Sequence, residues 1–355
     1  MKKSKIIKEL EDDSNETIES PENFTWATHM RSCNEIYRLY MDEHLDIQPE
    51  FQRNFVWKPD AQSRFIDSLS KKLPIPSLLL GKDSKSEKHI VIDGLQRIKT
   101  IVKFFEEEDW KLTKIQGIDE KISGKKVSII KDKSLNLYNR VKNSDIPVTF
   151  LVYDFSNKSL MNDLFNIFNR INTGGVKLNH QEIRNCIFSG NFNNLLRDVA
   201  KSDNWKNCMG KTSKVIRFES EEIILRVFAF NEELDDYDGN LARFLNNYMA
   251  KQKDISEDEI QEKRNIIFSS LSFINEKIDK PETVHTWGKT LKEGLLVGVS
   301  QNIDTLIHKS KEEAQALFED FETDEEFSKE KLKQGLSKKA YVQSRLRKSI
   351  EIFGK

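Results

Sequence analysis

The sequence predicts an α+β protein in which a small mixed α/β domain precedes a mostly helical region. The first half alternates β-rich runs with amphipathic segments, whereas apolar residues recur at three- and four-residue intervals in the second half. A chain of 355 residues also exceeds the usual size of one hydrophobic core. We therefore predict a polar N-terminal arm over residues 1–23, the mixed domain over 24–155 and the helical region over 156–355.

Strands and helices alternate in the predicted mixed domain. Apolar and β-branched runs predict strands at residues 45–47, 77–80, 89–92 and 146–153. Helical spacing predicts helices at residues 34–40, 59–69 and 98–105. Pro59 suits the first turn of its helix, because the missing N–H of proline has no intrahelical partner there. Residues 111–145 read as a variable excursion between these elements.

The second half is predicted to be helical throughout, with no internal repeat. Apolar stripes indicate helices at residues 160–168, 183–188, 219–231, 239–251, 256–279, 285–308, 311–319 and 338–353.

The composition limits the classes of protein to which this chain can belong. Hydrophobic residues make up 37% and charged residues 32%, which is typical of a globular protein with a charged surface. The formal net charge of -1 gives no general attraction to nucleic acid or anionic membranes, so any such surface must be local. Cys33, Cys186 and Cys208 form no CxxC pair and are expected to be reduced structural thiols. Because no apolar run suggests a signal or a membrane span, we expect a cytoplasmic protein with no membrane partner.

The segment Asp93-Gly94-Leu95-Gln96-Arg97 stands where a predicted strand leads into a predicted helix. The free N–H groups and the dipole at a helix start attract phosphate. Arg97 can clamp a phosphate, Gln96 can orient a water or a phosphate oxygen, and Asp93 can hold Mg²⁺ or fix Arg97. Such turns are common, however, and local physics alone favours Asp93 as a simple helix cap.

A second polar cluster is Gln52-Arg53, followed by Trp57. An arginine beside an aromatic ring can serve phosphate binding or base stacking. Equally, Arg53 can pair with a carboxylate while Trp57 is buried.

The third cluster joins Asn169, Arg170 and Asn172 to the pair Gly174-Gly175. The glycines can end a helix as a C-cap, or the loop can present its N–H groups and polar side chains to a ligand. The residues themselves favour neither interpretation.

Three passages in this order resemble one family: PEFQRNFVW, PIPSLLLGKDSKSEKHIVIDGLQRIKTIVKFF and FNIFNRINTGGVKLNHQEIRNCIFSGNFNNLL. They are similar to the domain named for its DGQQR motif, the front half of GmrSD-type modification-dependent restriction enzymes in phage-defence loci. The resemblance covers roughly residues 45 to 200. It implies a ParB/sulfiredoxin-like fold and an NTP-binding, NTP-hydrolysing protein that controls cleavage of foreign DNA.

The resemblance also implies site residues by matching positions. The catalytic group would be Asp93, Gln96 and Arg97, with Asp93 as the metal ligand for Mg²⁺. The nucleoside triphosphate would be held by Gln52, Arg53, Gly94, Arg97, Asn172, Gly174 and Gly175.

Two departures from the family pattern bear on activity. Leu95 replaces the first glutamine of the motif, so hydrolysis is impaired if that glutamine positions water and unchanged if it only packs. After residue 200 the only histidines are His285 and His308, which lack the pattern of a His-Asn-His nuclease. We expect both to be surface or core residues. The basic run at 337–348 can touch DNA but is more typical of a solvated helix face.

The leading hypothesis is therefore a nucleotide-sensing antiviral defence protein. One alternative is a metal-dependent DNA nickase that needs no NTP. The other is a non-enzymatic module that recognises DNA or a protein and works with a separate nuclease. The candidate partners are a nucleoside triphosphate, DNA, a nuclease subunit and a second copy of the chain in a homo-oligomer.

Overall fold

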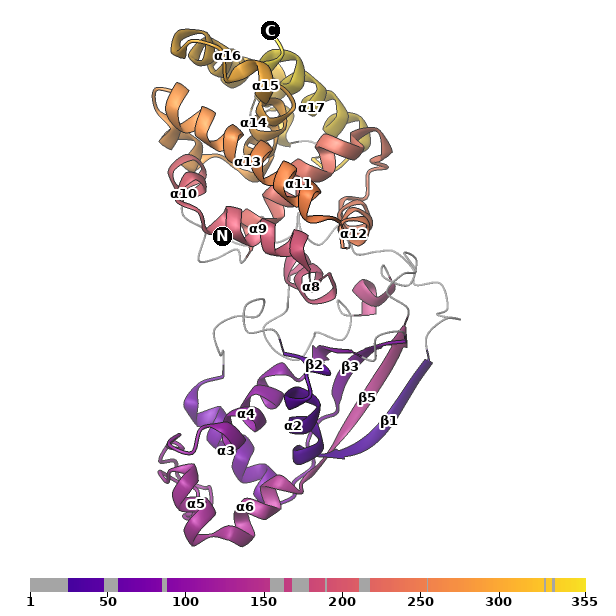
Figure 1. Ribbon diagram of the computed structural model, residues 1–355, viewed down its shortest axis with the longest axis vertical. Helices are drawn as coiled ribbons and strands as arrows, with labels where there is room; N and C mark the ends of the chain where they lie inside the picture. The colour runs from indigo at the N-terminus through magenta and orange to yellow at the C-terminus, as the bar shows by residue number, and fades with distance from the viewer. Residues whose placement is uncertain are drawn as a thin grey trace. The chain divides into compact units, whose positions relative to one another are not determined.

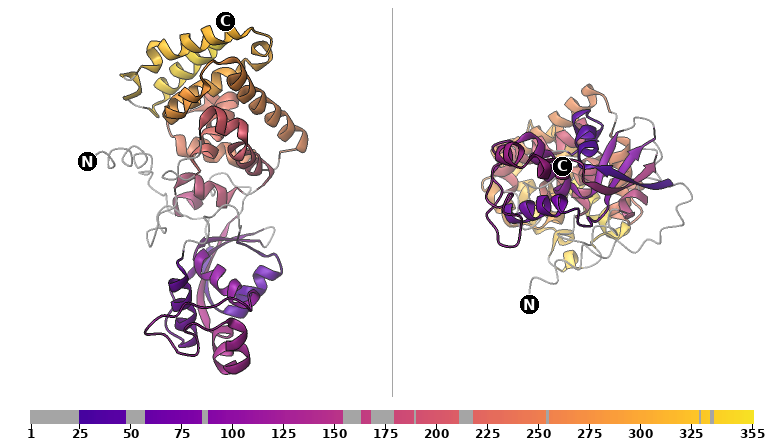
Figure 2. Two further views of the ribbon diagram at one scale, coloured as in Figure 1. Left: turned by 90° about the vertical axis from the view of Figure 1, so that its left-hand side faces the viewer. Right: turned by 90° about the horizontal axis from the view of Figure 1, so that it is seen from below.

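The computed structural model describes residues 25–47, 57–84, 88–153, 163–167, 179–188, 190–210, 218–253, 255–328, 330–333 and 336–355. These residues form two compact units divided between residues 178 and 179, coloured indigo to magenta and pink to yellow in Figures 1 and 2. Residues 163–167 belong to the first of these units. The predicted arm at 1–23 lies outside the described residues. The predicted α+β class is confirmed, with a small mixed sheet followed by helices.

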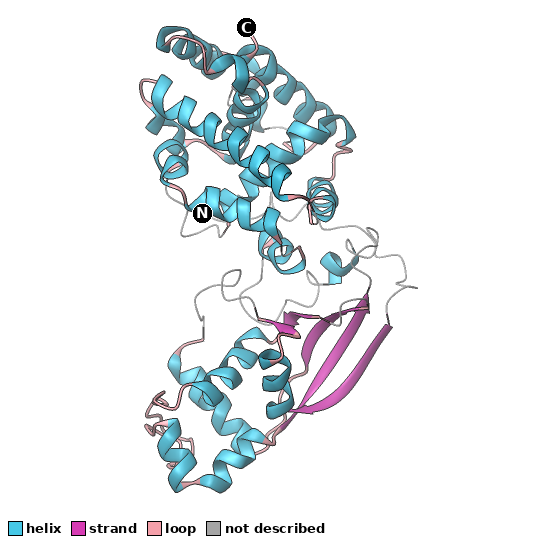
Figure 3. Cartoon of the chain, in the orientation of Figure 1, coloured by secondary structure: helices cyan, strands magenta, loops and turns pink. Residues whose placement is uncertain are grey.

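A mixed sheet of order β1-β5-β3-β4-β2 forms one side of the first unit (Figure 3). Its strands are β1 Thr25–Ser32, β5 Asp145–Tyr153, β3 Leu78–Asp83, β4 His89–Asp93 and β2 Leu45–Asp46. β5 pairs antiparallel with β1 and parallel with β3. β4 pairs antiparallel with β3 and parallel with β2. The sheet therefore mixes both pairing types, as expected for an α+β domain.

The four predicted strands are present, but β1 was missed. Its side chains from Thr25 to Met30 are exposed, and Trp26 and Met30 are 69% and 60% exposed. A strand with no buried face needs no alternation of apolar and polar residues, so no period-two pattern marks this strand in the sequence.

Three helices cover one face of this sheet: α2 Cys33–Met41, α3 Pro59–Ser70 and α4 Leu95–Glu106. Ser32 and Glu35 form a capping box that starts α2, and Pro59 occupies the first turn of α3 as expected. The apolar faces of these helices share one core with Leu78, Leu80, Val91, Ile146, Val148 and Phe150 of the sheet. Burial of this shared apolar surface holds the layers together.

Two further helices, α5 Val127–Lys133 and α6 Leu135–Lys142, occupy the segment predicted to be a variable excursion. Each is less than three turns long, too short for an apolar stripe to be recognised. Val127 and Ile130 from α5 and Leu137 and Val141 from α6 join the core of the first unit.

The second unit is a helical assembly. Its α-helices are α8 His180–Ile187, α9 Asn191–Lys201, α10 Asp203–Met209, α11 Glu219–Glu233, α12 Leu241–Lys251, α13 Glu257–Lys277, α14 Lys289–Gln301, α15 Ile303–Leu306, α16 Lys311–Thr323 and α17 Lys339–Phe353. Its 3-10 turns are η1 Leu234–Asp236, η2 Pro281–Thr286, η3 Glu325–Phe327 and η4 Lys331–Lys333.

This arrangement confirms the predicted helical second half but corrects two details. α9 and α10 were not predicted. The single helix expected at 285–308 is divided, because α14 begins after Gly288 and ends at Gln301, with Asn302 as its C-cap. The Asn302 side chain donates to the carbonyl oxygens of Gly298 and Ile350, which fixes this break.

Close packing of α14 against α17 depends on a glycine. A Cβ atom added at Gly298 would lie 2.2 Å from Ser349 Oγ. Ser349 Oγ in turn donates to the carbonyl oxygen of Gly294 over 2.7 Å. The absence of a side chain at residue 298 thus lets the two helix backbones approach each other.

The three cysteines are buried and unpaired with one another. Burial raises the pKa of the Cys33 and Cys208 thiols to about 12, which keeps both protonated at neutral pH. They are structural thiols, as expected. Among the described helices, none is both long and apolar enough to cross a bilayer.

Candidate functional site

The predicted phosphate-binding turn forms where β4 meets α4. β4 ends at Asp93, α4 begins at Leu95, and Gly94 between them has φ +100° and ψ 10°. This left-handed conformation disfavours any residue with a side chain. A Cβ atom at Gly94 would also lie 2.3 Å from Cδ2 of Leu78, which is fully buried. Both backbone conformation and packing therefore require glycine here.

The start of α4 is open. Ile98 makes the first intrahelical bond, from its N–H to the carbonyl oxygen of Gly94 at 3.0 Å, so the N–H groups of Leu95, Gln96 and Arg97 precede it. No side chain caps the helix, and its first turn holds no acidic residue. The expectation that Asp93 caps α4 is therefore wrong. The helix start retains its partial positive charge and can accept an anion.

Asp93 instead pairs with Arg97. Arg97 Nη2 donates to Asp93 Oδ2 over 2.8 Å, while Nη1 donates to the carbonyl oxygens of Pro76 and of Ser77, the latter at 3.3 Å. The Arg97 side chain is 11% exposed and that of Asp93 49% exposed. Burial lowers the pKa of Arg97, although the Asp93 carboxylate opposes this shift. Arg97 thus ties α4 to the segment entering β3, and Asp93 remains accessible to a cation.

Gln96 connects α4 to Trp57, which follows the Gln52-Arg53 pair in the sequence. Its Oε1 accepts the backbone N–H of Trp57 at 3.2 Å, and Gln62 Nε2 donates to the Trp57 carbonyl at 2.9 Å. The Trp57 ring packs edge-on against Phe65 with centroids 5.5 Å apart. Trp57 is four residues after Arg53 in the sequence. Gln96 therefore anchors the described end of the segment that carries the Gln-Arg pair.

The structure brings four of the predicted site residues together: Asp93, Gly94, Gln96 and Arg97. The others lie outside the described residues, namely Gln52, Arg53, Asn169, Arg170, Asn172, Gly174 and Gly175. Their part in the site stays a prediction.

Leu95, the departure from the family motif, is a core residue. Its side chain is 6% exposed and joins the apolar cluster beneath the sheet. At this position the side chain points into the core, away from the polar groups of the turn, which favours a packing role for the residue.

The site offers one carboxylate for a metal ion. Within the part of the chain that the structure describes, no three His, Cys, Asp or Glu side chains gather as a metal site. A single half-exposed carboxylate, Asp93, still suits Mg²⁺, which keeps several waters and takes further oxygens from substrate phosphates.

The two C-terminal histidines and the basic run at 337–348 show no arrangement of a catalytic site among the described residues. His285 is exposed, and its Nε2 lies 2.8 Å from the carbonyl oxygen of Asn207; His308 is exposed beyond α15. In the basic run, Arg345 is buried against Glu293, and Arg347 pairs with Asp235. Much of the run's charge is therefore neutralised within the chain.

The fold and the site together define a small α+β domain in which a glycine turn opens a helix beside an Asp-Arg ion pair. Residues 36–189 match the family described as the GmrSD restriction endonuclease, N-terminal domain. No curated protein and no solved structure matches the chain. This part of the chain is therefore similar to the N-terminal domain of GmrSD-type restriction endonucleases, a family of restriction enzymes that act in defence.

Proposed function

We propose that the chain binds a nucleoside triphosphate with Mg²⁺ at the start of α4, hydrolyses it, and thereby controls cleavage of foreign DNA in antiviral defence. The observation that carries this proposal is the open helix start, where three N–H groups follow a turn that only glycine fits. The family assignment supports the link to DNA restriction.

Each described residue has a role in this proposal. The phosphates accept hydrogen bonds from the backbone N–H groups of Leu95, Gln96 and Arg97. The Arg97 guanidinium adds those of its N–H donors that do not bond to Pro76, Ser77 or Asp93. Asp93 holds Mg²⁺, which neutralises phosphate charge when bound. Gln96 keeps its Nε2 for a water or a phosphate oxygen, because its Oε1 already accepts from Trp57.

The remaining predicted residues complete the site through the family resemblance. We propose that Gln52 and Arg53, which precede Trp57 in the sequence, help to hold the nucleotide. Asn172, Gly174 and Gly175 are proposed to bind the nucleotide from their glycine-containing loop. Because Leu95 packs in the core, we propose that hydrolysis depends on Asp93, Gln96 and Arg97 and does not need a second glutamine in the motif.

Removal of the Arg97 guanidinium tests the proposal. Calorimetric titration of the full chain with each of the four nucleoside triphosphates and Mg²⁺ should show binding that Arg97→Ala weakens about tenfold or more. Asp93→Ala should weaken binding less, because this carboxylate meets phosphate only through the metal. Phosphate release should fall in both variants.

Arg140→Ala is the matched control, since Arg140 is an exposed arginine on α6 of the same unit. It should leave affinity unchanged within about twofold. Arg97→Ala protein that stays folded by circular dichroism and binds as tightly as wild type would refute the assignment of Arg97. Wild-type protein that binds none of the four nucleotides would contradict the proposed function and favour recognition of DNA or of a protein partner.

A further inference from the structure

Gln62 on α3 is a buried polar residue outside the group assigned to the nucleotide. Its side chain amide is enclosed, since the residue is only 5% exposed. Nε2 donates to the carbonyl oxygen of Trp57 over 2.9 Å, whereas Oε1 has no hydrogen-bond partner among the described residues. A buried acceptor without a partner costs free energy of folding. Stability alone therefore does not account for a glutamine at this position.

Two hydrogen bonds connect Gln62 to Gln96 through the backbone of Trp57. The Trp57 carbonyl accepts from Gln62, and the Trp57 N–H donates to Gln96 Oε1 at 3.2 Å. The Trp57 ring also packs against Phe65 on α3, with centroids 5.5 Å apart. α3 thus holds Trp57 at two points, its carbonyl and its ring. Because the N–H belongs to the same residue, these contacts also fix the donor that Gln96 accepts.

The bond from Trp57 decides which end of the Gln96 amide is left for a ligand. Rotation about the last side chain torsion of a glutamine exchanges Oε1 and Nε2, and the two orientations differ little in intrinsic energy. With Oε1 occupied by the Trp57 N–H, Nε2 is the end that remains. Only Nε2 can donate to a phosphate oxygen or to a water oxygen. The orientation that suits an anion is therefore the one that Trp57 selects.

We propose that Gln62 is a positioning residue for nucleotide hydrolysis, which acts through Trp57 to hold the Gln96 amide with Nε2 toward the reacting water or phosphate oxygen. In this reaction the water oxygen bonds to the terminal phosphorus as the bond to the nucleoside diphosphate breaks, and phosphate and a proton are released. The inference rests on the proposed function and extends it to a residue outside the family motif. Gln62 needs no contact with the nucleotide for this role.

Steady-state hydrolysis by the full chain tests the role with Gln62→Met, Gln96→Met and the variant that carries both changes. Methionine is similar in size to glutamine but has no amide. We expect Gln62→Met to lower kcat about tenfold and to change KM by about twofold or less, because the N–H groups that bind the phosphates remain. Gln62→Leu should behave in the same way.

The double variant separates a positioning role from a general structural one. If Gln62 acts through Gln96, the variant with both changes should lose no more kcat than Gln96→Met alone. Gln116→Met is the matched control, since Gln116 is an exposed glutamine of the same unit. It should leave kcat and KM unchanged within about twofold.

Hydrogen–deuterium exchange at the Trp57 N–H tests the same connection in the ligand-free protein. Gln62→Met and Gln96→Met should each speed this exchange, whereas Gln116→Met should not. Losses of kcat that multiply in the double variant, or exchange at Trp57 equal to wild type in Gln62→Met, would overturn the role of Gln62 while hydrolysis by the wild type stands. Wild-type protein that hydrolyses none of the four nucleoside triphosphates would instead contradict the proposed function, and this inference with it.

Discussion

Replacement of Glu293 by alanine is expected to destabilise the helical unit by about 3–5 kcal/mol, because it leaves buried positive charge without its partner. Glu293 lies on α14 with a side chain that is 3% exposed. Its two carboxylate oxygens are each 3.2 Å from a guanidinium nitrogen, one of Arg226 on α11 and one of Arg345 on α17. One residue therefore connects three helices.

The surrounding charges explain the size of the effect. Arg226 also pairs with Glu222 at 2.6 Å, and Lys289 lies 3.4 Å from Glu222. Burial alone would raise the pKa of Glu222, but Arg226 and Lys289 outweigh it and hold that pKa below the ordinary value. Arg184 adds a further positive charge near Glu222, so loss of Glu293 leaves the surrounding cations with fewer carboxylate partners.

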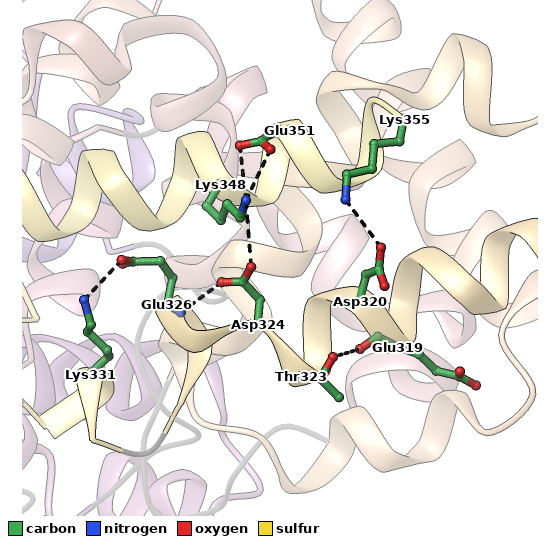
Figure 4. A network of polar contacts seen from close by, with 9 residues as sticks. All are labelled: Glu319, Asp320, Thr323, Asp324, Glu326, Lys331, Lys348, Glu351 and Lys355. Atoms are coloured by element: carbon green, nitrogen blue, oxygen red, sulfur yellow. Dashed lines mark hydrogen bonds and ion pairs between the residues drawn. The ribbon is translucent and has the colours of Figure 1, made fainter.

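Urea unfolding of the full chain, followed by helical circular dichroism, measures this loss. Glu351→Ala is the control, because Glu351 is 62% exposed and pairs with Lys348 on the surface of α17, 3.2 Å away (Figure 4). That variant should cost less than about 1 kcal/mol. If Glu293→Ala were as stable as Glu351→Ala, the buried ion network would not stabilise the helical unit as described.

Replacement of Gly94 by alanine is the second large effect, with an expected destabilisation of about 2–4 kcal/mol. Part of the cost is the left-handed backbone at φ +100°. The rest arises because the new methyl group would meet Leu78 at 2.3 Å, and Leu78 is fully buried between β3 and the helices. Relief of this contact would shift the start of β3 or of α4.

Gly117 provides the matched control in the same unit. It also has positive φ, at +85°, but a Cβ atom there would meet nothing within 4 Å. Gly117→Ala should therefore show only the backbone cost, about 1–2 kcal/mol. The difference between the two variants in thermal or urea unfolding isolates the contact with Leu78. Equal losses would show that the turn at Gly94 is not tightly packed.

Elements with a buried apolar face were predictable from the sequence. α4 shows the helical period and β5 is dense in β-formers, and both were found close to their predicted bounds. β1 was not predictable because it is exposed on both faces, and its place is fixed only by pairing with β5. The break before α14 was not predicted because the apolar pattern continues across Gly288.

The site was predictable in position but not in its internal contacts. A glycine between a strand and a helix indicated the turn, and Gly94 is there as expected. The bonds from Arg97 to Pro76 and Ser77, and from Trp57 to Gln96, join residues 20 to 39 positions apart in the sequence, so only the folded chain shows them.

The most direct test of the central claim is hydrogen–deuterium exchange at the start of α4 with and without a saturating nucleoside triphosphate and Mg²⁺. The N–H groups of Leu95, Gln96 and Arg97 precede the first intrahelical bond, so phosphate binding should slow their exchange while α13 in the other unit serves as reference. Protection at these residues is the predicted result. Binding of the nucleotide with unchanged exchange there would contradict the account, because the phosphates would then lie elsewhere.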